Sequence, residues 1–187
     1  MMRIAYAFPV IFLFSCTSAA EKMAAPFKPY DAILLKKPSG KPGDKSADSF
    51  ALGLEKVPDT LARGLRAFAI AFPQHAASES YLYAATLLSE RSGRKFETAK
   101  WCEEFIQMYP KSPWYKDALV AAAHNYEMTG TFEKAILYNK RIAKEFKGTP
   151  LAEHAETVLK MLNLGITSPE QQFEYMMKHR KDTVSAN

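Results

Sequence analysis

The chain has 187 residues, of which 48% are hydrophobic and 24% charged, so one domain of ordinary size can bury a continuous core. Its formal net charge of +5 is spread along the sequence. A nucleic-acid-binding protein is expected to concentrate its basic residues on one face, so we interpret the charge as solvated surface. Two cysteines cannot form a framework of disulfides, and the settings of Cys16 and Cys102 differ too much for pairing.

Residues 1–15 are typical of a secretory signal peptide. Arg3 supplies the positive charge, and the apolar run 4–14 is too short to span a bilayer, for which about 20 residues are needed. Two processing sites compete. Leu13-Phe14-Ser15-Cys16 resembles a bacterial lipobox, whereas Ser18-Ala19-Ala20 resembles an ordinary signal-peptidase site that would release a soluble protein. A cysteine directly after the apolar run favours the lipobox, so we expect acyl chains on Cys16 to hold the protein on a membrane.

Residues 16–46 are predicted to form a flexible tether. Proline, glycine and lysine recur through this stretch, and only residues 30–35 are apolar enough to pack. Such a composition is typical of a mostly unfolded linker. Its basic side chains could touch anionic headgroups, but a solvated linker explains them better.

A helical domain is predicted for residues 47–180, because apolar residues recur there at helical spacing. A short helix over 47–54 comes first. Seven longer helices follow, at 57–72, 76–91, 95–109, 113–128, 131–146, 150–164 and from residue 168. The segment Ser168-Pro169-Glu170-Gln171 is a capping box with proline at the first helical position.

The last predicted helix has a narrow apolar face, made only of Phe173, Met176 and Met177. This is typical of the terminal helix of a stack, whose outer side faces water. We expect residues 181–187 to form a disordered tail.

One helix-turn-helix unit repeats between residues 71 and 165. Phe72, Tyr109 and Phe146 close successive units at intervals of 37 residues. The first helix of each unit has apolar residues at positions i, i+4, i+7, i+8 and i+11, beginning at Ala77, Tyr115 and Leu151. Repetition at this period is typical of stacked helical hairpins.

The second unit resembles the tetratricopeptide repeat (TPR). The matching positions are Leu119, Ala122, Ala123 and Tyr126 in the first helix, Gly130 and Phe132 at the turn, and Ala135 where the two helices cross. It departs from the pattern at Asn139, where a large aromatic residue is usual, and at Lys147, where proline is usual. The resemblance covers residues 59–179 and implies an all-α, TPR-like helical-hairpin solenoid of about seven helices, wound as a right-handed superhelical stack.

Phrases such as Tyr109-Pro110-Lys111-Ser112-Pro113 look like the long-period TPRs of Gram-negative envelope proteins. Two such families are the TPR lipoproteins of the outer-membrane β-barrel assembly machine and the periplasmic TPR proteins of the Tol–Pal system. This resemblance implies a non-catalytic adaptor or scaffold that is anchored in the outer membrane and faces the periplasm. The alternative location is the periplasm itself, as a soluble protein. The alternative is a regulatory accessory subunit of a cell-wall synthesis or Tol–Pal cell-division complex.

TPR proteins bind a peptide or protein segment on a concave face lined by first helices. The resemblance places eight residues of this chain on that face: Asp117, Val120, His124, Glu127, Met128, Glu153, Glu156 and Lys160. Their mixture of carboxylates, an imidazole and apolar surface would suit a partner segment with basic and apolar side chains. The resemblance implies envelope proteins as partners, and the spread of the basic residues along the chain argues against nucleic acid.

No catalytic or metal site is predicted. Cys102 and His124 are the only pair that could suggest a thiol nucleophile, but no motif joins them, and Cys102 lies on a helical stripe with Phe105 and Tyr109. We expect a buried structural thiol. The four histidines lack the i, i+3 or i, i+4 spacing that places two metal ligands on one helix face, and no cofactor-binding motif is present.

Overall fold

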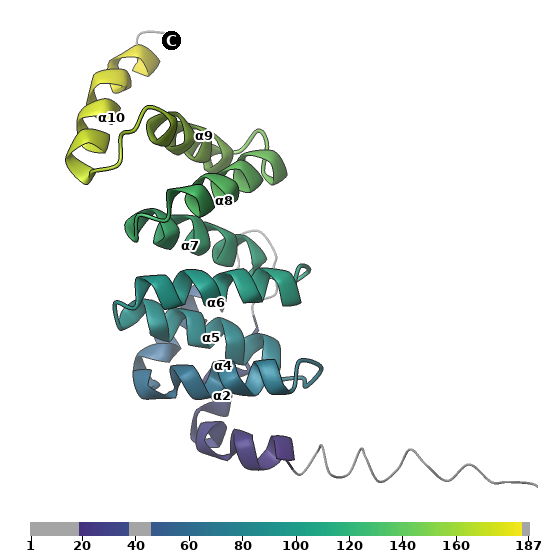
Figure 1. Ribbon diagram of the computed structural model, residues 1–187. Coiled ribbons are helices and arrows are strands. Elements are labelled where there is room, and N and C mark those ends of the chain that lie inside the picture. The colour runs from purple at the N-terminus through teal and green to yellow at the C-terminus, as the bar shows by residue number, and fades with distance from the viewer. Residues whose placement is uncertain (1–18, 38–45, 185–187) are drawn as a thin grey trace, which may run out of the picture. The chain divides into compact units, whose positions relative to one another are not determined.

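The computed structural model describes residues 19–37 and 46–184, which form helices and turns without any strand (Figure 1). The all-α class predicted from the sequence is confirmed. Cys16 and the signal peptide lie outside the described residues. The chain divides into two compact units, Met1–Leu88 and Ser89–Asn187, and the division falls near the end of α5.

The first unit begins with helical residues 19–24 and then contains several short helices before two longer ones. In chain order these are η1 (Ala25–Tyr30), α2 (Asp31–Leu34), α3 (Ser46–Gly53), η2 (Leu54–Lys56), η3 (Asp59–Leu61), α4 (Ala62–Ala71) and α5 (Ser78–Arg91). The core contains Leu65 and Phe68 of α4, which are completely buried, and the predicted apolar stripe of α5, where Ala84 and Ala85 are completely buried.

The flexible tether predicted for residues 16–46 is wrong for residues 19–37, which fold onto the first unit. The ring of Phe27 is only 3% exposed and packs edge-on against Tyr81, with centroids 5.3 Å apart. It also meets Phe68, and the Tyr81 hydroxyl donates a hydrogen bond of 2.9 Å to Asp31. The prolines do not unfold this segment, because Pro26 and Pro29 lie inside the short 3-10 helix η1. Phe27 and the buried Leu34 then supply the apolar surface that docks it.

The second unit contains the last residues of α5 and five further helices. These are α6 (Lys95–Met108), α7 (Tyr115–Met128), α8 (Phe132–Glu145), α9 (Pro150–Asn163) and α10 (Pro169–Val184). Helices α6 to α9 have 14 residues each. In chain order α6 packs against α7, α7 against α8 and α8 against α9 (Figure 1). The seven longer helices predicted from the sequence are α4 to α10, and most of their ends fall within one or two residues of the prediction.

Glycine ends each first helix in the left-handed region. Gly93 and Gly130, 37 residues apart, have φ angles of 71° and 70°, and Gly165 has 73°. At the α7–α8 turn, Thr131 closes the loop by donating its backbone N–H to Tyr126 O over 2.8 Å. The positive φ angles of these glycines are common at helix ends, because glycine has no Cβ that would clash in the left-handed conformation.

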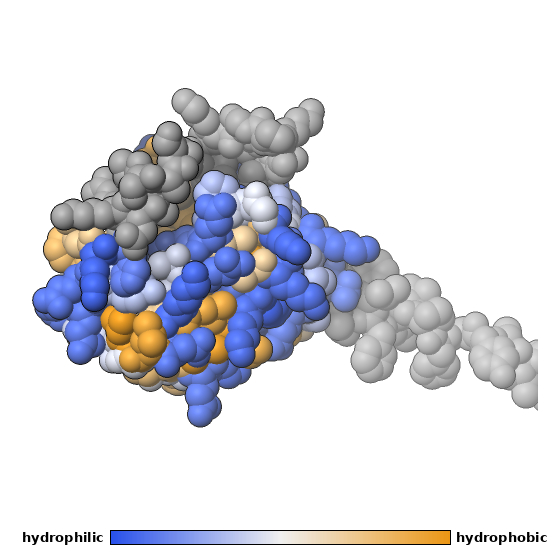
Figure 2. Space-filling model, turned by 90° about the horizontal axis from the view of Figure 1, so that it is seen from above, coloured by the Kyte–Doolittle hydropathy of each residue, from blue (hydrophilic) through white to orange (hydrophobic). Residues whose placement is uncertain are grey.

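The capping box predicted for α10 is confirmed, but its apolar face is not buried. Gln171 N donates to Ser168 Oγ over 3.2 Å, and Gln171 Oε1 accepts from Ser168 N. Phe173, Met176 and Met177 are between 45% and 61% exposed. Figure 2 views the molecule from above and shows apolar side chains gathered among hydrophilic ones. The helix also continues to Val184, so the disordered tail predicted for 181–187 is wrong for its first four residues, and the last three lie outside the described residues.

Candidate functional site

Helix α7 leaves one face open because its residues there are small or charged. Its buried stripe includes Leu119, Ala122 and Tyr126, as the repeat pattern predicts. Between the exposed Asp117 and His124, the side chains on the other face are only those of Val120 and Ala121, which are half-buried. Short side chains flanked by longer polar ones make a hollow in the helix surface.

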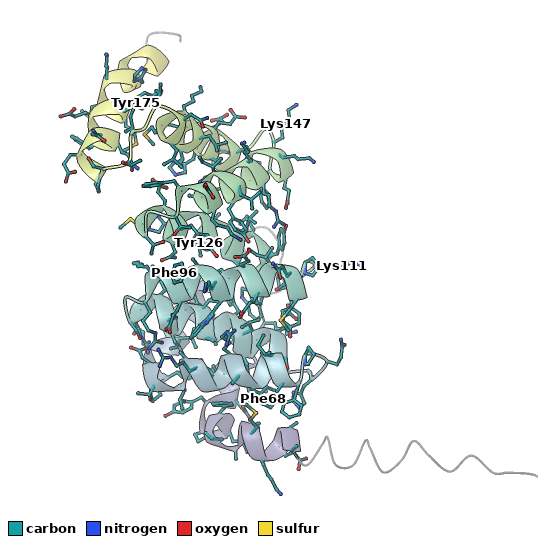
Figure 3. The ribbon with its side chains drawn as sticks, in the orientation of Figure 1. Phe68, Phe96, Lys111, Tyr126, Lys147 and Tyr175 are labelled. Carbon is teal, nitrogen blue, oxygen red and sulfur yellow. The ribbon has the colours of Figure 1, made fainter. Side chains whose placement is uncertain are left out.

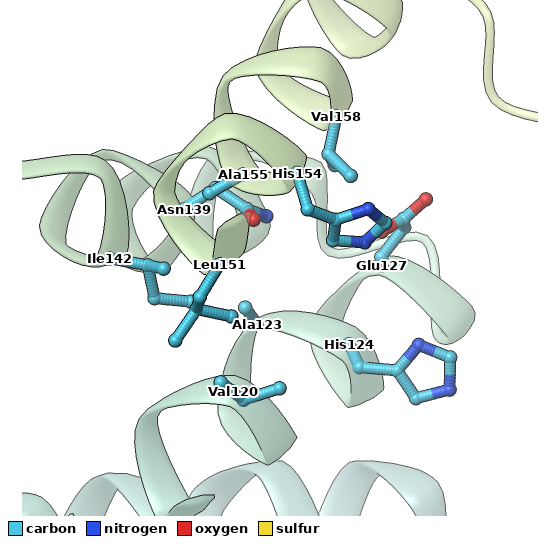
Figure 4. Close-up of a pocket in the computed structure, with 10 residues that line it drawn as sticks. All are labelled: Val120, Ala123, His124, Glu127, Asn139, Ile142, Leu151, His154, Ala155 and Val158. Carbon is cyan, nitrogen blue, oxygen red and sulfur yellow. The ribbon is translucent and has the colours of Figure 1, made fainter. Parts of the chain in front are cut away.

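Two adjoining cavities occupy this hollow, and we call them together the α7 groove. The larger has a volume of about 510 Å³ and is lined by Glu90, Lys116, Asp117, Val120, Ala121, His124, Asn125 and Leu151. The smaller, of about 60 Å³, lies among α7, α8 and α9 and is lined by Val120, Ala123, His124, Glu127, Asn139, Ile142, Leu151, His154, Ala155 and Val158 (Figure 4). Val120, His124 and Leu151 line both, so the two cavities lie side by side on α7.

The larger cavity holds a buried polar side chain with an unsatisfied acceptor. Asn125 is 1% exposed, and its Nδ2 donates to Ala121 O over 3.0 Å. Its Oδ1 finds no hydrogen-bond donor among the described residues. Leaving such a group buried without a partner costs about 1–3 kcal/mol. A ligand that brings a donor into the groove would recover part of that cost.

Glu90 presents a second acceptor at the same cavity. One of its oxygens binds the Lys95 ammonium, whereas the buried Oε2 has no hydrogen-bond partner among the described residues. Asp117 adds a carboxylate at the rim, and Lys116 is the one ammonium in the cavity lining. The groove therefore combines an apolar floor with an excess of hydrogen-bond acceptors.

Four of the eight residues predicted for the concave face line the α7 groove. Asp117 lines the larger cavity, Glu127 the smaller, and Val120 and His124 both. In Figure 4 the His124 ring turns away from Leu151 and Ile142, which places it at the mouth. Glu127 is further fixed by a hydrogen bond of 2.7 Å that its Oε1 accepts from Gln172 of α10.

The other four predicted residues do not line the groove. Met128 is 56% exposed at the end of α7, and Glu153, Glu156 and Lys160 lie on the exposed surface of α9. The groove instead uses the face of α9 that carries Leu151, His154, Ala155 and Val158.

Sequence reasoning missed these α9 residues because it carried the positions of α7 over to the next unit by register. Three of the four, Leu151, Ala155 and Val158, belong to the predicted apolar stripe of this helix. Part of that stripe lines the smaller cavity, where Val120 and Ala123 of α7 lie. Asn125 was missed as well. Its signal was an amide side chain inside an alanine-rich helix, next to the buried Tyr126.

A half-buried polar cluster ties α7 to α6 and α8. Glu103 of α6 accepts hydrogen bonds from the Tyr126 hydroxyl of α7, at 2.5 Å, and from the Lys134 ammonium of α8, at 2.7 Å (Tyr126 in Figure 3). Burial by itself would raise the pKa of Glu103, but the hydrogen bonds from Lys134 and Tyr126 and the charge of Lys134 outweigh it and hold that pKa below its usual value. Burial and the same carboxylate raise the pKa of Tyr126. The cluster keeps the groove helix in place.

The residues considered for other chemistry lie apart from any cavity or do not converge. Cys102 is completely buried in α6, as its helical stripe predicts, so the thiol has no exposed surface, whereas His124 is exposed. Within the described residues, no three His, Cys, Asp or Glu side chains form a group able to hold a metal ion. None of the described helices is long and apolar enough to cross a membrane.

Comparison with known proteins adds no relative to this description. No model of a protein family matches the chain, and searches among curated proteins and among solved structures find no match. The α7 groove and the sequence motifs are therefore the features of the chain that bear on its function.

Proposed function

We propose that the protein is a non-catalytic adaptor of the bacterial cell envelope, built on TPR-like hairpins, that binds a segment of a partner protein in the α7 groove. The observation that carries the proposal is the groove itself. Val120, Ala121 and Leu151 give it an apolar floor, and charged side chains surround it. Largely apolar concavities with a few polar groups are where proteins bind ligands, and an extended or helical segment fits a groove between helices.

The envelope setting is supported by the N-terminal sequence. Arg3, the apolar run 4–14 and the lipobox-like Leu13-Phe14-Ser15-Cys16 would direct the chain out of the cytoplasm and acylate Cys16. With several acyl chains the attachment would be stable, because one chain alone binds a bilayer only marginally. The groove would then face the periplasm, where envelope proteins are the available partners.

Photo-crosslinking in intact cells tests this function. A crosslinking amino acid in place of Val120 points into the groove, and the same amino acid in place of Lys140, an exposed residue of α8, provides the matched control. We expect a specific protein adduct from position 120 and none from position 140. Adducts with barrel-assembly components or nascent barrel proteins would assign the adaptor to outer-membrane assembly.

Other crosslinking results would assign a different role or contradict the proposed binding face. Adducts with cell-wall synthases or Tol–Pal proteins would instead assign a regulatory role in envelope constriction. A folded, abundant protein that gives no adduct from position 120, or the same adducts from both positions, would overturn the proposal that this groove is the binding face.

A further inference from the structure

The chain contains an internal counterpart of the α7 groove that is already filled. The apolar stripes of α5 and α7 begin at Ala77 and Tyr115, 38 residues apart, so Glu79, Leu82, Tyr83 and Thr86 of α5 correspond to Asp117, Val120, Ala121 and His124 of α7. The α5 residues are covered: Leu82, Tyr83 and Thr86 are at most 8% exposed. Their α7 counterparts are half-buried or exposed.

The contacts on α5 show what kind of side chains cover such a face. The Lys37 ammonium forms an ion pair with Glu79. The buried ring of Phe50 stacks on Tyr83, with centroids 5.9 Å apart. A cation on the carboxylate and an apolar ring beside it, both from the N-terminal part of the same chain, thus occupy the face of α5.

Helix α7 also has a carboxylate at the position of Glu79, but it has only a small side chain at the position of the Tyr83 ring. Asp117 corresponds to Glu79, whereas Ala121 replaces Tyr83, and the cavity of about 510 Å³ opens beside it. Asn125 and Glu90 also line this cavity, and their Oδ1 and Oε2 atoms are buried acceptors without hydrogen-bond donors among the described residues. Both positions call for a donor from a ligand.

We infer that the α7 groove captures a lysine or arginine side chain of the partner segment, with an aromatic or branched apolar residue next to it. The cationic head would donate to Asn125 Oδ1 and interact with the carboxylates of Glu90 and Asp117, while the apolar neighbour covers Val120, Ala121 and Leu151. The lining offers the carboxylates of Glu90 and Asp117 and the amide oxygen of Asn125 as acceptors, and a cationic donor forms stronger hydrogen bonds to such groups than a neutral one. This inference depends on the proposed function and names the chemistry of its partner.

Peptide titrations of the ¹⁵N-labelled full chain test the inference. The probes are acetyl-Gly-Ser-Phe-Lys-Leu-Ser-Gly-amide and versions with arginine, norleucine or glutamate in place of lysine. Norleucine keeps the apolar stem of lysine and removes only the amine. We expect the lysine and arginine peptides to shift the backbone amides of residues 117–125 and to bind at least about tenfold more tightly than the norleucine peptide, with glutamate weakest.

Variants identify the acceptors. Asn125→Leu and Asp117→Asn should reduce the preference for lysine over norleucine, and Asn125→Asp should increase it, because a third carboxylate would join those of Glu90 and Asp117 near the cation. Glu133→Gln, which removes an exposed carboxylate of α8 outside the groove lining, should leave the preference unchanged. If Asn125→Leu fails to fold, Asn125→Asp and Asp117→Asn still decide.

The outcomes separate this inference from the proposed function. Equal binding of lysine and norleucine peptides, or a preference unaffected by Asp117→Asn and Asn125→Asp, would overturn the cation inference even where crosslinking at position 120 finds a partner. Absence of binding by every peptide would also overturn it. Loss of both peptide binding and crosslinking would remove the proposed function as well.

Discussion

Glu103 joins three helices of the second unit through one carboxylate. It accepts one hydrogen bond from the Tyr126 hydroxyl of α7 and another from the Lys134 ammonium of α8. These partners hold the pKa of Glu103 below its usual value of 4.5. A lowered pKa in the folded state means that folding favours the charged form. This contribution to stability is complete above the unfolded-state pKa and is lost as the pH falls through the folded-state pKa.

Glu103→Gln should therefore destabilise the protein by about 1–3 kcal/mol at pH 7, because the amide cannot replace the charge-assisted acceptor. The difference from the wild type should shrink below about pH 4.5, as the wild-type carboxylate takes up its proton. Urea unfolding at pH 7 and at pH 3.5 measures both values. Glu133→Gln, which alters an exposed carboxylate of α8, should show little change at either pH. A gap of equal size at both pH values would contradict the assigned role of Glu103.

Among the helical elements, the N-terminal segment 19–37 is held mainly by side chains distant in sequence. Phe27 contacts Phe68 and Tyr81, and its ring also lies 3.1 Å from where a Cβ on Gly64 would stand. Phe27 can therefore approach the surface of α4 closely because Gly64 has no side chain. Losing this ring should release the segment without unfolding α4.

Phe27→Ala should cost about 3–5 kcal/mol of local docking free energy, since it removes a buried aromatic side chain. Hydrogen exchange should become much faster in residues 19–37 and stay unchanged in α7 to α9. Lys28→Ala, at the exposed neighbouring position, is the matched control and should leave exchange in the segment unaltered. Unchanged protection of 19–37 in the Phe27 variant would show that other contacts hold the segment.

The sequence predicts the helical elements better than it predicts where segments dock. Helix periodicity, the glycines at 93 and 130 and the Ser168 capping box are local signals, and the structure contains all of them. The docking of Phe27 on Phe68 and Tyr81 involves pairs 41 and 54 residues apart, which no local pattern encodes. The same limit explains the groove. Asp117 and Val120 follow from the register of one helix, but Leu151 and His154 depend on how α9 packs against α7.

At the scale of the whole molecule, hairpins that contact mainly their neighbours in sequence should unfold locally. In repeat architectures, stability is close to a sum of repeat terms and nearest-neighbour terms. In the second unit, α6 packs on α7, α7 on α8 and α8 on α9. A defect at one turn should therefore spread only to the adjoining helices.

Gly130→Ala is the variant that tests this locality. A Cβ there would meet no atom within 4 Å, so the cost arises from the φ angle of 70° alone and should be about 1–2 kcal/mol. Hydrogen exchange should accelerate in α7 and α8 and remain unchanged in α4. Gly130→Asn should cost less, because asparagine tolerates the left-handed region better. Uniform acceleration along the chain would instead indicate a single cooperative unit.

The folded segment 19–37 also sets how far the protein could stand from a bilayer. With a flexible tether over 16–46, an acylated Cys16 would allow the folded part of the protein to lie far from the membrane. Since residues 19–24 are already helical, only two residues separate that cysteine from the folded segment, a span of about 10 Å at full extension. An acylated form would hold its first unit against the lipid headgroups, and the partner would have to meet it at the membrane surface.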